Sequence, residues 1–202
     1  MQNRLSYLAL GDSYTIGEAV DEAERWPIQL VNELSKVGFD TIEQRIIACT
    51  GWTTDDLLSA ICQALPNKSY DLVSINIGVN NQYRGYPINQ YEKELRKILE
   101  LAISFTIKEN KGVIVISIPD YGVTPFGQQH APKQITEEID RYNRITEDIC
   151  DNNKIAFVNI TDISRKAKDN PTLIASDGLH PSGKMYSQWV EKILPKIRLL
   201  IG

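Results

Sequence analysis

The sequence predicts an α/β fold in which helices cover both faces of a parallel sheet of five strands. Apolar runs of strand length recur five times along the 202 residues, and they are rich in Leu, Ile and Val. Nearly continuous apolar runs are typical of strands that are buried on both faces. A segment with helical periodicity follows each run, and this alternation predicts a three-layer α/β/α sandwich.

The individual elements follow from these patterns. Strands are predicted at residues 5–10, 41–48, 71–77, 112–118 and 154–160, and helices at 26–37, 53–65, 89–110, 134–153 and 182–200. Pro27 suits the first turn of its helix, whereas Pro195 predicts a kink or an end in the last helix. Right-handed crossovers leave few topologies, and we expect a flavodoxin-like doubly wound order. No linker or repeat interrupts the pattern, so we expect a single domain over residues 1–202.

The composition argues against several classes of protein. A formal net charge of -4 argues against a nucleic-acid-binding surface. No apolar stretch approaches the roughly 20 residues that span a bilayer, and the first apolar run is too short for a signal peptide. Cys49, Cys62 and Cys150 form no C-x-x-C pair, so we expect reduced, partly buried thiols and a cytoplasmic protein. We expect no metal and no cofactor, and the sequence predicts no oligomeric state.

Polar segments follow all five predicted strands. They read GDSYTIGE, CTGWTT, GVNNQYRG, PDYGVTPFGQQHAPK and a longer stretch that ends in ASDGLHPSG. The carboxyl ends of parallel strands meet at one edge of a sheet, and ligands bind there in this architecture. The sequence therefore predicts a functional site at that edge.

Residues in these segments have the chemistry that ester hydrolysis needs. Ser13 is a candidate nucleophile and His180 a candidate base, with Asp177 three residues before it in a tight turn. An aspartate on one ring nitrogen leaves the other free to accept the serine proton, and it stabilises the imidazolium that forms. The backbone amides of Ser13 and Gly51 and the side-chain amide of Asn80 are candidate donors to an oxyanion.

Taken singly, each candidate has an ordinary structural explanation. A serine after a strand caps a helix, Asp-Gly and Asn-Asn pairs form turns, and a glycine there adopts a left-handed conformation. These explanations do not predict that all the candidates fall at one sheet edge. Asp12 is expected to tie down its loop by hydrogen bonds, and His130 is left out of the site because it lacks a carboxylate at triad spacing.

The same residues resemble the SGNH hydrolases, also called GDSL-type esterases and lipases. Their Ser, Gly, Asn and His blocks correspond here to GDSYTIGE, CTGWTTDDL, IGVNNQ and SDGLHPSG, which span residues 11–181. The resemblance implies a three-layer fold and metal-free hydrolysis of acyl esters. It implies the triad Ser13, His180 and Asp177, with Gly51 and Asn80 completing the oxyanion hole beside the Ser13 amide.

The sequence departs from the family pattern at two positions. Tyr14 stands where the family has Leu, and Asn81 follows Asn80 where the family usually has Asp. The second change puts the support of the Asn80 loop in question, because an amide carries no charge. No G-x-S-x-G motif is present, which argues against an α/β-hydrolase fold.

Large side chains in the strand-end loops are expected to line a substrate pocket. The predicted substrate-binding residues are Tyr14, Trp52, Tyr83 and Tyr121, with Phe126 as a further candidate. We expect a small-molecule acyl ester as substrate, either a short-chain or acetyl ester or an acetylated sugar. A lysophospholipid or an acyl thioester is the alternative, and a non-catalytic ligand-binding module is a remote one. Arg84 is expected to meet an anionic leaving group or to face water, and the loop 119–133 to be a mobile cover or an ordered connection.

Overall fold

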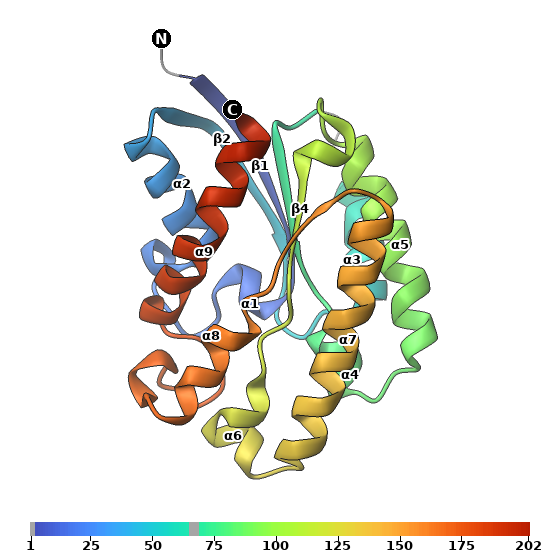
Figure 1. Cartoon of the computed structure of the whole chain (residues 1–202), viewed down its shortest axis with the longest axis vertical. Helices are drawn as coiled ribbons and strands as arrows, with labels where there is room; N and C mark the ends of the chain where they lie inside the picture. Colours follow the sequence, from blue (N-terminus) through green and yellow to red (C-terminus); the bar gives the residue numbers. More distant parts are fainter. Residues whose placement is uncertain (1–2, 65–68) are drawn as a thin grey trace.

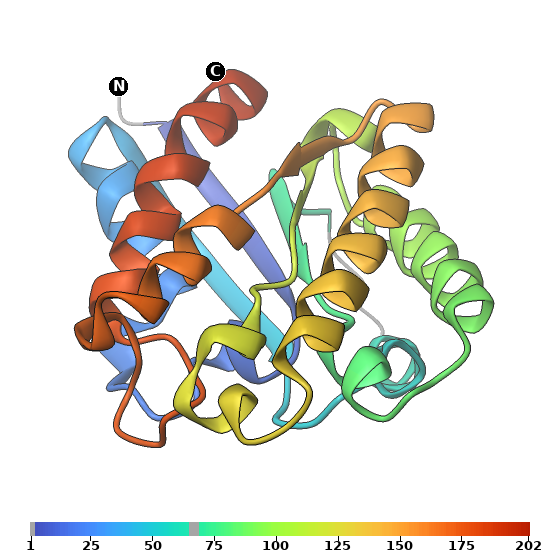
Figure 2. The same cartoon turned by 60° about the horizontal axis from the view of Figure 1, so that its bottom comes forward.

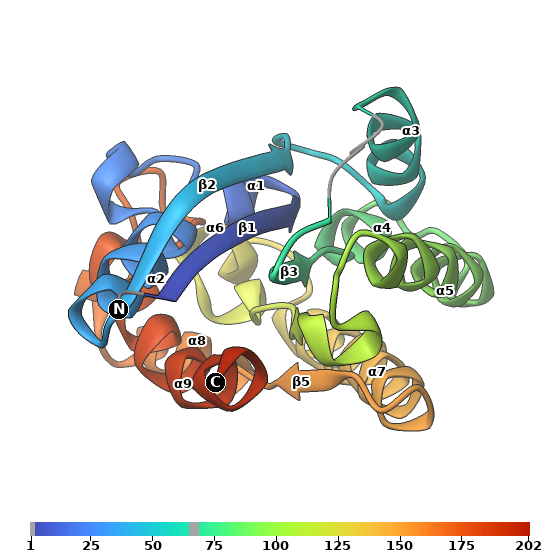
Figure 3. The same cartoon turned by 90° about the horizontal axis from the view of Figure 1, so that it is seen from above.

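The computed structural model describes residues 3–64 and 69–202, and a five-stranded sheet lies at its centre. The strand order is β2-β1-β3-β4-β5, and every neighbouring pair is parallel. Figure 3 shows β2, β1, β3 and β5 in this order from one end of the sheet. This order confirms the predicted doubly wound topology. The strands are β1 (Asn3–Gly11), β2 (Phe39–Ala48), β3 (Leu72–Asn76), β4 (Val113–Ile116) and β5 (Ala156–Val158).

Long helices cover both faces of the sheet, which confirms the three layers. Helices α2 (Trp26–Lys36) and α9 (Gly183–Ile201) pack on one face. Helices α3 (Thr54–Ala64), α5 (Ile88–Ser104) and α7 (Pro132–Asn152) pack on the other (Figure 1). Every residue of β3 and β4 is buried, as expected for strands between two helical layers.

The structure shows where two of the predicted helices end. The helix predicted to reach residue 110 ends at Ser104, because Tyr70 pairs with the following segment in a β-bridge to Thr106. Pro195 was predicted to cause a kink or an end in the helix expected over 182–200, and it does not end the helix, since α9 continues to Ile201. Its buried face is packed against the core on both sides of the proline, and this packing outweighs the missing hydrogen bond. The helix predicted over 53–65 was expected to end at residue 65, which lies outside the described residues.

Short helices that were not predicted stand at the carboxyl edge of the sheet. Figure 2 turns this edge toward the viewer. The α-helices among them are α1 (Ser13–Ile16), α4 (Val79–Tyr83), α6 (Pro125–Gln128) and α8 (Thr161–Arg165). The 3-10 turns of the described chain are η1 (Glu22–Glu24), η2 (Glu109–Gly112), η3 (Tyr121–Val123), η4 (Lys166–Lys168) and η5 (Pro171–Leu173).

The three cysteines differ in burial. Cys150 is buried, whereas Cys49 and Cys62 are exposed, so the prediction of partial burial is wrong for these two. Cys49 follows the last residue of β2 in a solvent-facing loop, and Cys62 lies on the outer side of α3. Among the helices of the described residues, none is both long and apolar enough to span a membrane.

Candidate active site

The turn after β1 presents Ser13 at the carboxyl edge of the sheet. Gly11 ends the strand, and no larger residue fits there, since a Cβ would lie 2.0 Å from Thr15 Oγ1 and 2.5 Å from the Asn76 carbonyl oxygen. Helix α1 begins two residues later with Ser13 itself. The backbone therefore turns sharply, and the Ser13 side chain faces the space beyond the strand ends.

Asp12 caps the N-terminus of helix α1. Its Oδ1 accepts a hydrogen bond from the Tyr14 amide at 3.0 Å, which confirms that its carboxyl group ties down the loop. Only 1% of Asp12 is exposed. Desolvation raises the pKa of the Asp12 carboxyl to about 7, although hydrogen bonds from backbone amides, that of Tyr14 first among them, oppose the shift.

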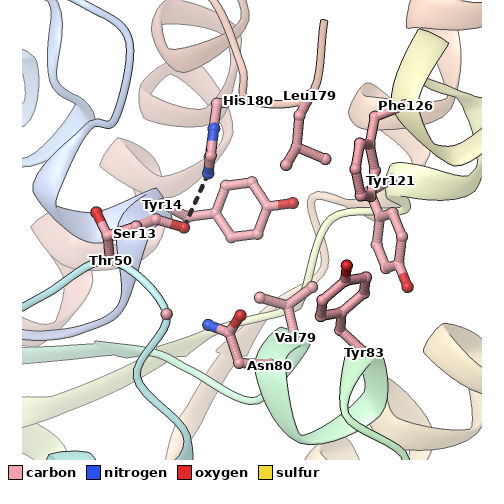
Figure 4. A pocket seen from close by; sticks show the side chains of 11 residues that line it. Ser13, Tyr14, Thr50, Val79, Asn80, Tyr83, Tyr121, Phe126, Leu179 and His180 are labelled. Carbon is pink, nitrogen blue, oxygen red and sulfur yellow. Dashed lines mark hydrogen bonds between the residues drawn. The ribbon is translucent and has the colours of Figure 1, made fainter. Parts of the chain in front are cut away.

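Ser13, His180 and Asp177 form one hydrogen-bonded series. His180 Nε2 lies 3.0 Å from Ser13 Oγ, drawn as the dashed line in Figure 4, and His180 Nδ1 lies 2.6 Å from Asp177 Oδ2. The other carboxylate oxygen, Oδ1, accepts hydrogen bonds from the amides of Leu179 and His180 at 2.9 and 3.0 Å. The three-residue spacing thus lets one carboxylate hold the turn with one oxygen and the imidazole with the other.

Charge on Asp177 sets the tautomer of the imidazole. Desolvation favours a higher pKa for the Asp177 carboxyl, but hydrogen bonds from the His180 ring and from two amides outweigh it and hold the pKa below its ordinary value. The ionised carboxylate favours the proton on Nδ1 of His180, so the Nε2 lone pair faces Ser13. The ring of Tyr14 packs edge-on against the imidazole, with ring centroids 5.5 Å apart.

Ser13, Gly51 and Asn80 line one cavity, and they come from the ends of three different strands. Gly51 has a φ of +80°, which disfavours any residue with a Cβ. Asn80 Nδ2 donates to the Trp52 carbonyl at 2.9 Å, which leaves its second hydrogen free to donate. Within the described residues, the amides of Ser13 and Gly51 donate no hydrogen bond. These three groups can therefore donate hydrogen bonds to an anion that is bound in the cavity.

The cavity has a volume of about 180 Å³. Figure 4 shows Ser13, His180 and Asn80 on one side, Tyr83, Tyr121 and Phe126 on the other, and the Tyr14 ring between them. The lining residues are Ser13, Tyr14, Thr50, Gly51, Val79, Asn80, Tyr83, Tyr121, Phe126, Leu179 and His180.

Four of the five aromatic residues predicted to face a substrate line this cavity, and Trp52 does not. Trp52 packs partly buried against the hydrophobic core, and only its carbonyl serves the site, through Asn80. The sequence prediction missed Thr50, Val79 and Leu179. Each of them directly adjoins a predicted residue, and that adjacency is the signal that identifies them.

Tyr83, Tyr121 and Phe126 form an aromatic wall, with ring centroids 6.1 to 6.4 Å apart. The Tyr14 hydroxyl points into the cavity toward this wall (Figure 4). Burial raises the pKa of Tyr14 well above its ordinary value, so the hydroxyl stays protonated. No partner for this hydroxyl is present in the described part of the chain, so it is available to a ligand.

The loop 119–133 contains short helical turns and is hydrogen-bonded to the helices beside it. It contains η3 and α6, and buried Asp120 anchors it by accepting hydrogen bonds from the Gly122 amide at 2.9 Å, Thr136 Oγ1 at 2.8 Å and Arg165 Nε at 2.9 Å. His130 stacks on Phe126 and is absent from the cavity lining.

Arg84 links the end of α4 to Gly51 and Asp56. Its Nη2 donates to the Gly51 carbonyl at 2.6 Å, and its Nη1 lies 3.9 Å from Asp56 Oδ2. In residues 3–64 and 69–202, no group of three or more His, Cys, Asp or Glu side chains is arranged to hold a metal ion.

Comparison with known proteins identifies relatives of this chain. Residues 9–188 match the GDSL-like lipase/acylhydrolase family. An arylesterase of Vibrio mimicus is 32% identical over an alignment of 120 residues, and the match covers 57% of this chain and 56% of that protein. The match thus spans little more than half of that relative's length.

Solved structures share the fold. A crystal structure of TesA matches with a TM-score of 0.76 and 19% identity, over 96% of this chain and 99% of that chain. An acetylxylan esterase from Geobacillus stearothermophilus matches with a TM-score of 0.71 and 21% identity, over 98% and 96% of the two chains. At these identities the likeness shows a common fold, which is the three-layer fold expected from the sequence.

Proposed function

The chain belongs to the GDSL-like lipase/acylhydrolase family, and on this premise we propose that it is a carboxylic ester hydrolase with Ser13 as its nucleophile. The observation that carries the proposal is the hydrogen-bonded series from Ser13 Oγ through His180 to Asp177, with links of 3.0 and 2.6 Å. A serine, a base and an orienting carboxylate in this arrangement define the serine-hydrolase mechanism on many unrelated folds.

In the proposed mechanism, His180 Nε2 takes the proton of Ser13 as Oγ attacks the carbonyl carbon of the ester. The negative charge that develops on the carbonyl oxygen is stabilised by the amides of Ser13 and Gly51 and by Asn80 Nδ2. The imidazolium then gives its proton to the leaving alkoxide. Water attacks the acyl-serine with His180 again as base, and Asp177 stabilises the imidazolium in both halves.

The cavity supports small, apolar substrates. At about 180 Å³ it is smaller than the roughly 300–1,000 Å³ that hold a drug-sized ligand. Val79, Leu179 and the aromatic wall give it apolar sides, so we propose short-chain or small aryl esters as substrates. This size favours them over the long chain of a lysophospholipid. The arylesterase relative agrees with this choice.

Acetylated sugars are the second candidate. The observation that favours them is the Tyr14 hydroxyl, which faces the cavity without a partner in the described chain and can bind a sugar hydroxyl. An acetylxylan esterase is also among the proteins that share the fold.

We further propose that residues 1–202 form one domain, because the sheet and both helical layers are built from segments along the whole described chain.

The test compares the Ser13→Ala variant with wild type on p-nitrophenyl esters of increasing chain length and on an acetylated xylose. We expect the variant to lose at least about 10⁴-fold in kcat, because attack by Oγ is then impossible. Ser59→Ala, on the exposed side of α3, is the matched control and is expected to keep full activity. A fluorophosphonate probe is expected to label Ser13 in wild type. Turnover retained in Ser13→Ala would overturn the nucleophile assignment.

A further inference from the structure

The two segments that carry Gly51 and Asn80 are joined by side-chain hydrogen bonds, some of them from residues that do not line the cavity. Gly51 lies in the loop before α3, and Asn80 lies on α4, so their separation depends on how these segments are fastened. One link is the hydrogen bond from Asn80 to Trp52. A second link joins the next residue of α4, Asn81, to the first residue of α3, Thr54.

The orientation of the Asn81 amide is forced by its neighbour. Its Oδ1 accepts from the Thr54 backbone amide at 3.0 Å, and its Nδ2 lies 2.7 Å from Thr54 Oγ1. A backbone N–H can only donate, so the oxygen of Asn81 must face it and Nδ2 must face the hydroxyl. The Thr54 hydroxyl thus accepts a hydrogen bond from Asn81, and its own proton needs a different acceptor.

Glu94 on α5 is that acceptor. Its Oε2 lies 2.5 Å from Thr54 Oγ1, and its Oε1 accepts from Gln90 Nε2 at 2.8 Å. Thr54 and Asn81 are fully buried, and only 9% of Glu94 is exposed. The series runs in one direction, from Asn81 through Thr54 to Glu94, and bulk water has little access to replace any of its members.

We propose that Thr54 and Glu94 are positioning residues for the oxyanion site, and that Glu94 makes an amide necessary at position 81. A carboxylate at position 81 would leave one hydroxyl proton, that of Thr54, between two carboxylates. One of the two contacts with Thr54 Oγ1 would then lack a hydrogen and become repulsive, and α4 would shift with Asn80 relative to Gly51. This inference rests on the proposed function, because it takes Gly51 and Asn80 as the oxyanion donors.

The experiment is a double-mutant cycle of Asn81→Asp and Glu94→Gln, measured as kcat and KM on p-nitrophenyl acetate. Asn81→Asp is expected to lose about 10- to 100-fold in kcat, the range for one unsatisfied buried polar group, with KM within about threefold. Glu94→Gln alone is expected to stay within about threefold, because Gln90 can turn to accept from the new amide.

The double variant is expected to regain most of the lost kcat. The amide introduced at position 94 can donate to the Thr54 hydroxyl, while that hydroxyl donates to the carboxylate introduced at position 81, so the series is satisfied in the reverse direction. A double variant no more active than Asn81→Asp would overturn the proposal.

Two further measurements keep the test decisive. If Asn81→Asp does not fold, Thr54→Val and Thr54→Ser replace it: the valine variant, which lacks the hydroxyl, should lose kcat, and the serine variant should keep it. Equal kcat in these two variants would also overturn the proposal. The melting temperatures of the four proteins in the cycle test the hydrogen-bonded series without turnover. We expect a lower melting temperature for Asn81→Asp and a restored one for the double variant. A wild type that hydrolyses no ester would overturn the proposed function, while the unfolding cycle still decides on the series.

Discussion

The substitution Asp177→Asn tests whether the carboxylate beside His180 sets the tautomer of the ring. In the protein, Asp177 Oδ1 accepts hydrogen bonds from the amides of Leu179 and His180, and Oδ2 faces His180 Nδ1. Two backbone donors fix the oxygen of an asparagine at the Oδ1 position. Its NH₂ group is then directed at Nδ1, which must act as an acceptor. The ring proton moves to Nε2, and His180 can no longer take a proton from Ser13.

The magnitude follows from the interactions that are lost. Removal of the charge deprives the imidazolium of one charge-assisted hydrogen bond, about 1.5–3 kcal/mol, which corresponds to roughly 10- to 150-fold in rate. The wrong tautomer adds to this loss, and the same substitution in a serine-protease triad lowers kcat by about 10⁴-fold. We therefore expect a decrease between about 10² and 10⁴ in kcat, with the fold intact because both turn hydrogen bonds remain.

The assay is the turnover of p-nitrophenyl acetate by wild type and Asp177→Asn, with circular dichroism and a thermal melt on both proteins. Asp162→Asn is the matched control, because this exposed carboxylate pairs with Lys192 away from the cavity. We expect the control to keep its activity. A well-folded Asp177→Asn protein that lost less than about tenfold would refute the tautomer argument.

Two further predictions concern the oxyanion site and the cap below it. Asn80→Ala should lower kcat by about 100- to 1,000-fold with little change in KM, as expected for a donor that acts in the transition state. The control variant Asn89→Ala, on the exposed side of α5, should keep its activity. A loss of kcat below about tenfold in Asn80→Ala would mean that the backbone amides suffice. Burial raises the pKa of Asp12 from 3.8 to about 7, so its contribution to stability is complete below about pH 4 and is lost as the pH rises to 7. The unfolding free energy of wild type relative to Asp12→Asn should therefore fall across this range, by a few kcal/mol at most, and equal pH dependence in denaturant titrations would contradict the assignment.

The sheet could be predicted because burial on both faces leaves a direct trace in the sequence. Residues Val113–Ile116 are all buried and all aliphatic, and a run of this kind is incompatible with an exposed face. The short helices α1 and α4 leave no such trace, because four or five residues are too few to show a helical period. Their positions depend on Gly11 and Gly78, where the backbone passes too close to its neighbours for a side chain.

The candidate site was only partly predictable, for a related reason. Ser13, Asp177 and His180 were found because their chemistry and their places after the strands agree. The direction of an aromatic side chain in a loop depends on the local backbone, and Trp52 follows a glycine with positive φ, which turns the indole toward the core. Glu94 carries no sequence signal at all, since its role depends on a hydroxyl from another helix.

The arrangement of the cavity separates reaction from selection. Ser13, Gly51 and Asn80 lie in the segments that follow β1, β2 and β3, which are adjacent in the sheet, and hydrogen bonds from Asn80 and Asn81 fasten the last two segments to each other. Two members of the aromatic wall, Tyr121 and Phe126, come instead from the connection after β4, which Asp120 anchors to the helices beside it. Substitutions in that connection can reshape the space for an acyl or aryl group without moving β1, which leads into the proposed nucleophile. The substrate range of this protein is therefore expected to depend on the wall, and its turnover on the strand ends.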